Sequence, residues 1–289
     1  MRYEGRIYRP PSEAKSVIIQ TTVGCSHNKC TFCNMYNKKQ FKVRNIDEII
    51  EDLKIARDYY ESVSRIFLAD GNALCLKTED LKIILSKVNE LFPECKRVGT
   101  YSSPRDILNK SVEELKELRN LGLKIAYLGI ESGSDEVLKN VNKGVNSKEL
   151  IKAGNKVIDS NIKLSVTLIS GLGGKANWKK HARESAKVVN EINPDYLALL
   201  TLFIDEETEI YDQIQNNRFK LLEPQEIIIE TKELLENLKL SNSVFRSNHA
   251  SNYLSLAGVL NRDKDKLLKK LDEAINDNSK YKPESLRGL

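Results

Sequence analysis

The segment TTVGCSHNKCTFCNMY, residues 21 to 36, contains three of the five cysteines in this chain of 289 residues. They are Cys25, Cys30 and Cys33, in the spacing C-x4-C-x2-C. Disulfide frameworks use cysteines in pairs, and a structural zinc site has four ligands, so three clustered cysteines fit neither pattern. Iron–sulfur clusters are held by cysteine thiolates, and three thiolates would leave one iron of a four-iron cube open. The segment therefore predicts a metal centre with an open coordination position.

The cysteine segment follows the first of six short apolar runs, which alternate with longer stretches of helical periodicity. The runs are Ser16–Thr22, Arg65–Asp70, Arg97–Tyr101, Lys124–Ile130, Lys163–Ile169 and Asp195–Thr201. Nearly continuous apolar runs are typical of strands that are buried on both faces of a parallel sheet. Six strand–helix units are too few for the closed eight-stranded barrel. The sequence predicts an α/β fold, a partial (β/α)6 TIM-like barrel whose site lies at the carboxyl ends of the strands.

Helix signals between the runs support this alternation. Asn45 is a good N-cap for one apolar-periodic stretch, and Thr78 stands before another. Ser111 and Glu114 have the spacing of a capping box, and Gly122 is placed as the C′ glycine of the same helix.

The alternation stops after about residue 205. We therefore predict a barrel over residues 1–205 and a mostly helical C-terminal extension over residues 206–289 that covers the barrel mouth. Two stretches of the extension, EPQEIIIETKELLENL and DKDKLLKKLDEAI, have helical patterns. Between them, the polar stretch FRSNHASN offers Arg246, Asn248 and His249, whose side chains can hydrogen-bond a polar or anionic substrate.

Composition and charge exclude some classes of protein. The formal charge is +5, from 46 basic and 41 acidic residues, which is mildly basic and does not require a nucleic-acid partner. The densest basic stretch, Lys175–Lys187, is interpreted as a solvated helix face, with His181 at the surface. No apolar run reaches about 18 residues, and the N-terminus lacks the apolar region of a secretory signal. We expect a cytoplasmic protein without a membrane segment, in a reducing compartment.

The cysteines and two later segments together resemble one known family, the radical S-adenosylmethionine (SAM) superfamily. Its commonest cysteine spacing, C-x3-C-x2-C, is one residue shorter than the spacing here. The stretch YLGIESGSDEVLKNVNKG, residues 127–144, resembles the fourth-strand segment of one branch of the family. That branch contains the oxygen-independent coproporphyrinogen oxidases, the methylthiotransferases and the Elongator-type tRNA enzymes. VTLISGLGG, residues 166–174, resembles the fifth-strand segment, and the whole resemblance covers about residues 16–205.

The resemblance implies an enzyme in which Cys25, Cys30 and Cys33 bind a [4Fe–4S] cluster whose open iron binds SAM. An electron from the cluster would cleave the SAM sulfonium and release a 5′-deoxyadenosyl radical that modifies a substrate. The resemblance also implies an electron donor such as flavodoxin or ferredoxin. Because no RNA-binding domain is appended, we expect a small-molecule substrate and not tRNA.

By the same resemblance, a set of residues at the ends of the strands is expected to contact SAM. The set is Phe32, Asp70, Gly71, Asn72, Ser102, Glu131, Lys143, Thr167 and Gly171. Phe32 would pack near adenine, and Lys143 would pair with the cofactor's carboxylate. The motif at Asp70 departs from the family's usual two glycines and an acid. Ser102 or Ser103 would replace an acid of the porphyrin branch, because Tyr101 stands at its position.

Other interpretations remain open. One is a zinc site completed by His27 or by a distant residue, as in a zinc-dependent RNA-binding module. Another is a non-catalytic carrier or chaperone of haem or of an iron–sulfur cluster, built on the same fold. Cys75 and Cys95 have no cysteine within ten residues and are expected to be ordinary small core residues, which predicts a single cluster per chain.

Overall fold

The computed structural model describes residues 1–288, which form two compact units. The first unit consists of residues 1–28, 35–128 and 153–164. The second consists of residues 29–34, residues 129–152 and the chain from Ser165 onward. The cysteine segment therefore contributes Cys25 to the first unit and Cys30 and Cys33 to the second.

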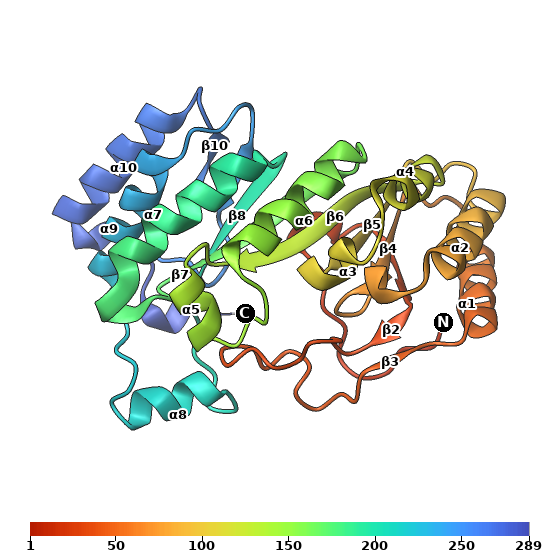
Figure 1. Ribbon diagram of the computed structural model, residues 1–289, viewed down its shortest axis with the longest axis horizontal. Helices are drawn as coiled ribbons and strands as arrows, with labels where there is room; N and C mark the ends of the chain where they lie inside the picture. The colour runs from red at the N-terminus through yellow and green to blue at the C-terminus, as the bar shows by residue number, and fades with distance from the viewer. Residues whose placement is uncertain (289) are drawn as a thin grey trace. The chain divides into compact units, whose positions relative to one another are not determined.

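The first unit is a layer of parallel strands with helices packed on it (Figure 1). Its strands are β1 (Val17–Gln20), β2 (Thr22–Val23), β3 (Lys42–Val43), β4 (Arg65–Ala69), β5 (Arg97–Ser102) and β6 (Leu123–Glu131). Its helices are α1 (Ile46–Tyr59), α2 (Thr78–Leu91), α3 (Pro104–Leu108) and α4 (Val112–Asn120), with short turns η1 (Pro11–Glu13) and η2 (Ala73–Cys75). The parallel order is β1-β4-β5-β6, whereas β2 and β3 form a small antiparallel pair.

Local signals in the sequence set the helix ends of this unit. The side chain of Asn45 caps α1 by accepting a hydrogen bond from the backbone of Asp47, 2.8 Å away. Ser111 and Glu114 form the predicted capping box at the start of α4. Gly122 follows α4 with φ of +111°, a conformation that residues other than glycine rarely adopt.

The second unit also combines strands with helices on one face. Its elements are α5 (Asp135–Asn140), β7 (Lys163–Ser170), α7 (Gly174–Ile192), β8 (Tyr196–Thr201), α8 (Glu209–Gln215), α9 (Pro224–Asn237), β9 (Val244–Ser247), β10 (Leu256–Val259), α10 (Lys264–Asn276), η3 (Asn278–Lys280) and η4 (Glu284–Leu286). Helix α6 (Ser147–Asp159) and strands β6 and β7 cross the unit boundary. The strand order is β7-β8-β9-β10, with β10 antiparallel to β9. Helix α9 packs against both α7 and α10 (Figure 1).

All six predicted strands are present, each followed by one or more helices, so the predicted α/β class is confirmed. The FRSNHASN stretch is different from the expected polar connection, because it begins in strand β9. Phe245 and Ser247 are buried while Arg246 between them is exposed, which is the alternation of a half-buried strand. The compact units do not divide at residue 205, since the second unit joins β8 to the C-terminal region. Among residues 1–288, no helix has the length and apolar character of a membrane span.

Candidate functional site

The carboxyl end of β4 supports the part of the cysteine segment that lies in the first unit. The backbone N–H of Gly71 donates to the carbonyl of Gly24 over 3.1 Å. The side-chain oxygen of Asn72 accepts from the backbone N–H of Ser26 over 3.1 Å. A Cβ atom on Gly71 would lie 2.8 Å from the Cα of Cys25, so only glycine permits this approach. Two of the predicted cofactor residues therefore hold the chain on both sides of Cys25.

Asp70, the third residue of this motif, is fully buried. Its Oδ2 accepts from the ammonium of Lys39 over 2.6 Å and from the backbone N–H of Gly24 over 3.2 Å. Its Oδ1 is buried too, and it makes no hydrogen bond of normal geometry within residues 1–288. One carboxylate oxygen thus holds the cysteine loop, and the other is an unsatisfied acceptor.

Tyr36 supplies a matching unsatisfied donor. Its hydroxyl is buried beside the Asp70 carboxylate and makes no hydrogen bond of normal geometry in the described part of the chain. Burial, and then the negative charge of Asp70, raise the pKa of Tyr36 far above its ordinary value, so the phenol keeps its proton. A buried polar group without a partner costs about 1–3 kcal/mol, so such groups often mark the place of a ligand. This donor and acceptor fit a cofactor that carries both amino and carboxylate groups.

The other part of the cysteine segment is anchored within the second unit. The N–H of Thr31 donates to the carbonyl of Val141 over 3.1 Å, and the carbonyl of Thr31 accepts from the N–H of Ile210 over 2.9 Å. The ring of Phe32, between Thr31 and Cys33, packs against a buried apolar cluster. The cluster consists of Val137, Val141, Leu172, Leu202 and Ile210. Packing and backbone bonds therefore fix the segment that carries Cys30 and Cys33.

Glu131 and Lys143 form an ion pair at the carboxyl end of β6, with 3.0 Å between Oε1 and Nζ. Their side chains are 13% and 12% exposed, so a ligand can reach them. Glu131 has φ of +63°, which is uncommon for a residue with a long side chain and often accompanies function. A Cβ atom on Gly129 would lie 2.0 Å from Oε1 of Glu131, so glycine at this position leaves room for the pair.

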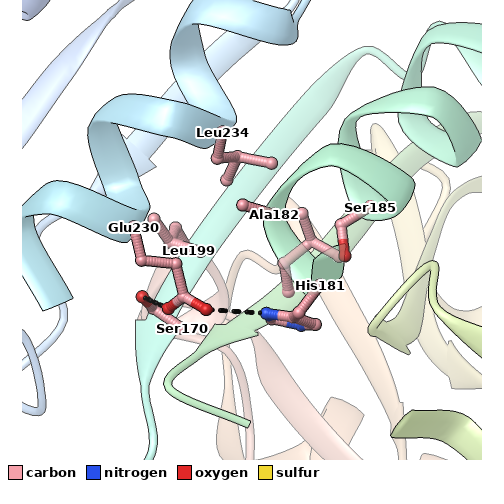
Figure 2. A pocket seen from close by; sticks show the side chains of 8 residues that line it. Ser170, His181, Ala182, Ser185, Leu199, Glu230 and Leu234 are labelled. Carbon is pink, nitrogen blue, oxygen red and sulfur yellow. Dashed lines mark hydrogen bonds and ion pairs between the residues drawn. The ribbon is translucent and has the colours of Figure 1, made fainter. Parts of the chain in front are cut away.

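The turn after β7 contains Gly171, with φ of +85°. Its N–H donates to Oε2 of Glu230 over 2.5 Å, and the hydroxyl of Ser170 donates to the same oxygen. Nδ1 of His181 lies 2.9 Å from Oε1 of Glu230, as Figure 2 shows. The prediction that His181 is at the surface is wrong, because its side chain is 3% exposed on the inner face of α7. The lysines of the same basic stretch are exposed, as predicted.

Two of the other predicted cofactor residues lie on strands. Thr167 is partly exposed on β7, on the opposite face from the buried Leu168. Ser102 is buried at the end of β5, and its hydroxyl donates to the carbonyl of Tyr127 over 3.1 Å. The structure thus gives the Ser102 hydroxyl a partner within the sheet.

The predicted substrate residues lie on β9 and the loop behind it. Arg246 is exposed and is in register with Ala198 on β8 and Ala257 on β10, so small side chains flank its guanidinium. Asn248 is exposed as well. His249 accepts a hydrogen bond at Nδ1 from the backbone N–H of Ser251, so its neutral ring carries the proton on Nε2.

Burial, and then the positive charge of Lys282, lower the pKa of His249 below its ordinary value, which favours the neutral ring. The same loop is tied to the end of β8, where Ser251 and Asn252 hydrogen-bond Thr201. These two residues of the polar stretch therefore have a structural role.

The five cysteines are all partly exposed. Burial raises the pKa of Cys95, and it raises the pKa of Cys75 to about 12, so both remain thiols at neutral pH. Within residues 1–288, no three His, Cys, Asp or Glu side chains are arranged around one metal position. The donor set of the segment itself is three thiols, and soft thiolate ligands suit iron–sulfur clusters.

Comparison with known proteins identifies relatives of this arrangement. Residues 19–183 match the family model described as the Radical SAM superfamily. The heme chaperone HemW of Bacillus subtilis is 22% identical over 218 residues, which cover 73% of this chain and 56% of that protein. The chain thus spans only about half the length of this curated relative.

Solved structures of similar fold are also found among known proteins. Coproporphyrinogen III oxidase (HemN) from Escherichia coli matches with a TM-score of 0.55 and 18% identity, over 76% of this chain and 50% of that one. The archaeal Elp3 of Methanocaldococcus infernus matches with a TM-score of 0.52 and 18% identity, over 91% of this chain and 63% of that one. These likenesses confirm the predicted fold class, an α/β partial barrel.

Proposed function

The chain belongs to the radical SAM superfamily, and on that premise we propose that it is a radical SAM enzyme. The observation that carries the proposal is the loop of three thiols, which is anchored by backbone hydrogen bonds on both sides of Cys25 and again at Thr31. Such anchoring holds the backbone beside the cysteines, while within residues 1–288 the thiols do not meet at one metal position, so cluster binding would have to gather them.

Cys25, Cys30 and Cys33 would hold a [4Fe–4S] cluster, and the open iron would bind SAM. When bound, the cluster and SAM would together supply one-electron reductive cleavage of the sulfonium and, through it, hydrogen-atom abstraction from the substrate. The chain's own residues would bind SAM and orient it. Lys143 offers its ammonium to the methionine carboxylate, and Glu131 accepts from polar groups of SAM. Oδ1 of Asp70, which makes no hydrogen bond of normal geometry within residues 1–288, accepts from the methionine amino group.

The remaining assignments follow the same orientation of the cofactor. Phe32 would pack near adenine, Thr167 would face the ribose, and Gly171 would let the nucleoside lie close to the backbone. Gly71, Asn72 and Ser102 would act on the cofactor site by positioning neighbouring chain segments, which Gly71 bonds through its N–H and Asn72 and Ser102 bond through their side chains.

The test is reductive cleavage of SAM. Protein reconstituted anaerobically with iron and sulfide, reduced and given SAM, should release 5′-deoxyadenosine and methionine in equal amounts. The Cys30→Ala protein, treated in the same way, is the control and should release neither. A reduced cluster that leaves SAM intact would contradict the proposal.

A second candidate function is a haem or iron–sulfur carrier, favoured by the similarity to a heme chaperone. A carrier of this kind would bind haem without consuming SAM. Titration with haem, followed by its absorbance, separates the two functions when it is run beside the cleavage assay. Haem binding without 5′-deoxyadenosine would support the carrier.

For the enzyme, we propose a small-molecule substrate and an electron donor such as flavodoxin or ferredoxin. Arg246, Asn248 and His249 would contact the substrate, with Arg246 binding an anionic group and Nε2–H of His249 donating a hydrogen bond. Once a substrate is in hand, Arg246→Ala should lower its turnover while uncoupled 5′-deoxyadenosine formation persists. Equal loss of both would place Arg246 in the cofactor site.

A further inference from the structure

The turn that joins β7 to α7 is hydrogen-bonded to one buried carboxylate, which comes from another helix, α9. Glu230 lies on α9, and its two oxygens meet Ser170, Gly171 and His181. Figure 2 shows the carboxylate of Glu230 directed between Ser170 at the end of β7 and the ring of His181 on α7. We propose that Glu230, oriented by His181, is a positioning residue that fixes the Gly171 turn for cofactor binding. This inference rests on the proposed function, which assigns Gly171 to the nucleoside of SAM.

The burial of Glu230 requires an explanation, because its side chain is only 3% exposed. A buried carboxylate is costly unless hydrogen bonds compensate it. Here the N–H of Gly171 can only donate, and the Ser170 hydroxyl and the His181 ring supply two further contacts. Such bonds to a charged acceptor are stronger than neutral ones. The carboxylate is therefore satisfied by groups that lie at the turn or face it.

His181 contributes to the same arrangement through its ring. Its Nδ1 faces Glu230, while its buried Nε2 has no hydrogen-bond partner among residues 1–288. A carboxylate held by an imidazole on one oxygen cannot rotate freely, so its other oxygen stays aimed at Ser170 and Gly171. The ring therefore orients the acceptor.

A fixed backbone at this turn would favour the binding of a ligand. Ligands of parallel α/β folds bind at the carboxyl ends of strands, and β7 ends at Ser170. Gly171 has a left-handed conformation, and a Cβ there would lie 2.8 Å from Cδ1 of Ile227. With its N–H bonded to Glu230, the peptide plane before Gly171 has one orientation, so the turn needs no reordering when a nucleoside binds.

The same two helices provide a matched control. Glu233, one turn further along α9, also reaches α7, where it pairs with Arg183 over 2.6 Å. It does not contact the β7 turn. Glu230→Met and Glu233→Met each remove a bridge between α9 and α7, a buried one and a more exposed one, and only the first removes the acceptor of Gly171. Glu230→Gln keeps one acceptor oxygen and serves as the conservative variant.

The first measurement is amide hydrogen exchange in protein without cluster or SAM. Glu230→Met should speed exchange of the Gly171 amide by roughly tenfold or more, with Leu168 on β7 still protected, because only a local bond is lost. Glu233→Met should match the wild type, and Glu230→Gln should fall between the two. Unchanged Gly171 exchange in both Glu230 variants overturns the inference, and so does a uniform loss of protection along β7.

The second measurement is calorimetric titration of the cluster-loaded protein with SAM. The Kd should rise roughly tenfold in Glu230→Met, because the Gly171 turn loses the hydrogen bond that orders it before the nucleoside binds. It should rise less in Glu230→Gln and stay unchanged in Glu233→Met. If Glu230→Met does not fold, Glu230→Gln decides, and an unchanged Kd there overturns the inference. A wild-type protein that binds no SAM refutes the proposed function instead, while the exchange experiment still reports on the turn.

Discussion

The carboxyl ends of β4 and β6 each carry an acid paired with a lysine, and the two pairs differ in burial. Asp70 and Lys39 are 2.6 Å apart, and the carboxylate is 0% exposed. Glu131 and Lys143 are 3.0 Å apart, and the carboxylate is 13% exposed. Asp70 also accepts from the backbone of Gly24, next to Cys25, whereas Glu131 bonds Lys143 alone among the contacts described above.

This difference distinguishes an ion pair that supports the cysteine loop from an ion pair that a cofactor can reach. A buried ion pair that also carries a loop cannot lose one partner without stranding the other charge. The Glu131–Lys143 pair holds no backbone of the cysteine loop among the contacts described above, and its carboxylate is 13% exposed, so a ligand can reach it. We therefore expect changes at the end of β4 to affect the cluster and stability as well as SAM binding, and changes at the end of β6 to affect SAM binding alone.

The largest expected effect is loss of the cluster when one of the three predicted thiol ligands is removed. Cys30→Ala should abolish the brown colour and the cluster, because two thiolates remain where three are needed, whereas Cys95→Ala should not. Iron and sulfide analysis of anaerobically prepared protein should give about four of each per wild-type chain. Two clusters per chain, or zinc alone, would be the wrong outcome for this account.

Asp70→Asn breaks the buried pair and should destabilise the protein by about 3–5 kcal/mol, the usual cost of leaving one charge of such a pair buried. Urea unfolding of the cofactor-free protein measures this. Cluster content should fall as well, because the acceptor that holds Gly24 loses its charge. A variant with wild-type stability and a full cluster would remove the distinction between the two strand ends.

Lys143→Ala tests the accessible pair from its basic side. It should weaken SAM binding by about 1.5–3 kcal/mol, the range for hydrogen bonds to charged groups, and should leave the cluster intact. Calorimetric titration gives the affinity, and iron analysis of the same sample gives the control. Loss of the cluster together with SAM affinity would show that the β6 end also supports the loop.

Tyr36→Phe should have the smallest effect on stability. The Tyr36 hydroxyl makes no hydrogen bond of normal geometry in the described chain, so removing it should change the unfolding free energy by less than about 1 kcal/mol. If the hydroxyl donates to the cofactor, SAM affinity should nevertheless fall. A large loss of stability in this variant would mean that the hydroxyl already has a partner.

Much of the fold could be predicted because strands such as Lys163–Ser170 are continuous apolar runs and helices such as α4 carry their own caps. Strand β9 was missed, since four residues with an arginine among them give too little alternation to recognise. His181 was misplaced because its partner, Glu230, comes from a different helix. The one local signal was an acid within the apolar run IIIET of α9, which is unusual unless the acid is bonded.

The most direct test of the account is a titration of SAM into cluster-loaded wild-type and Glu131→Gln proteins. The substitution keeps size and removes only the charge of the accessible carboxylate at the end of β6. We predict that the Kd for SAM rises about tenfold, in line with a lost charge-assisted hydrogen bond, while iron content and unfolding free energy stay at wild-type values. An unchanged Kd with a full cluster would contradict the assignment of this strand end to cofactor binding.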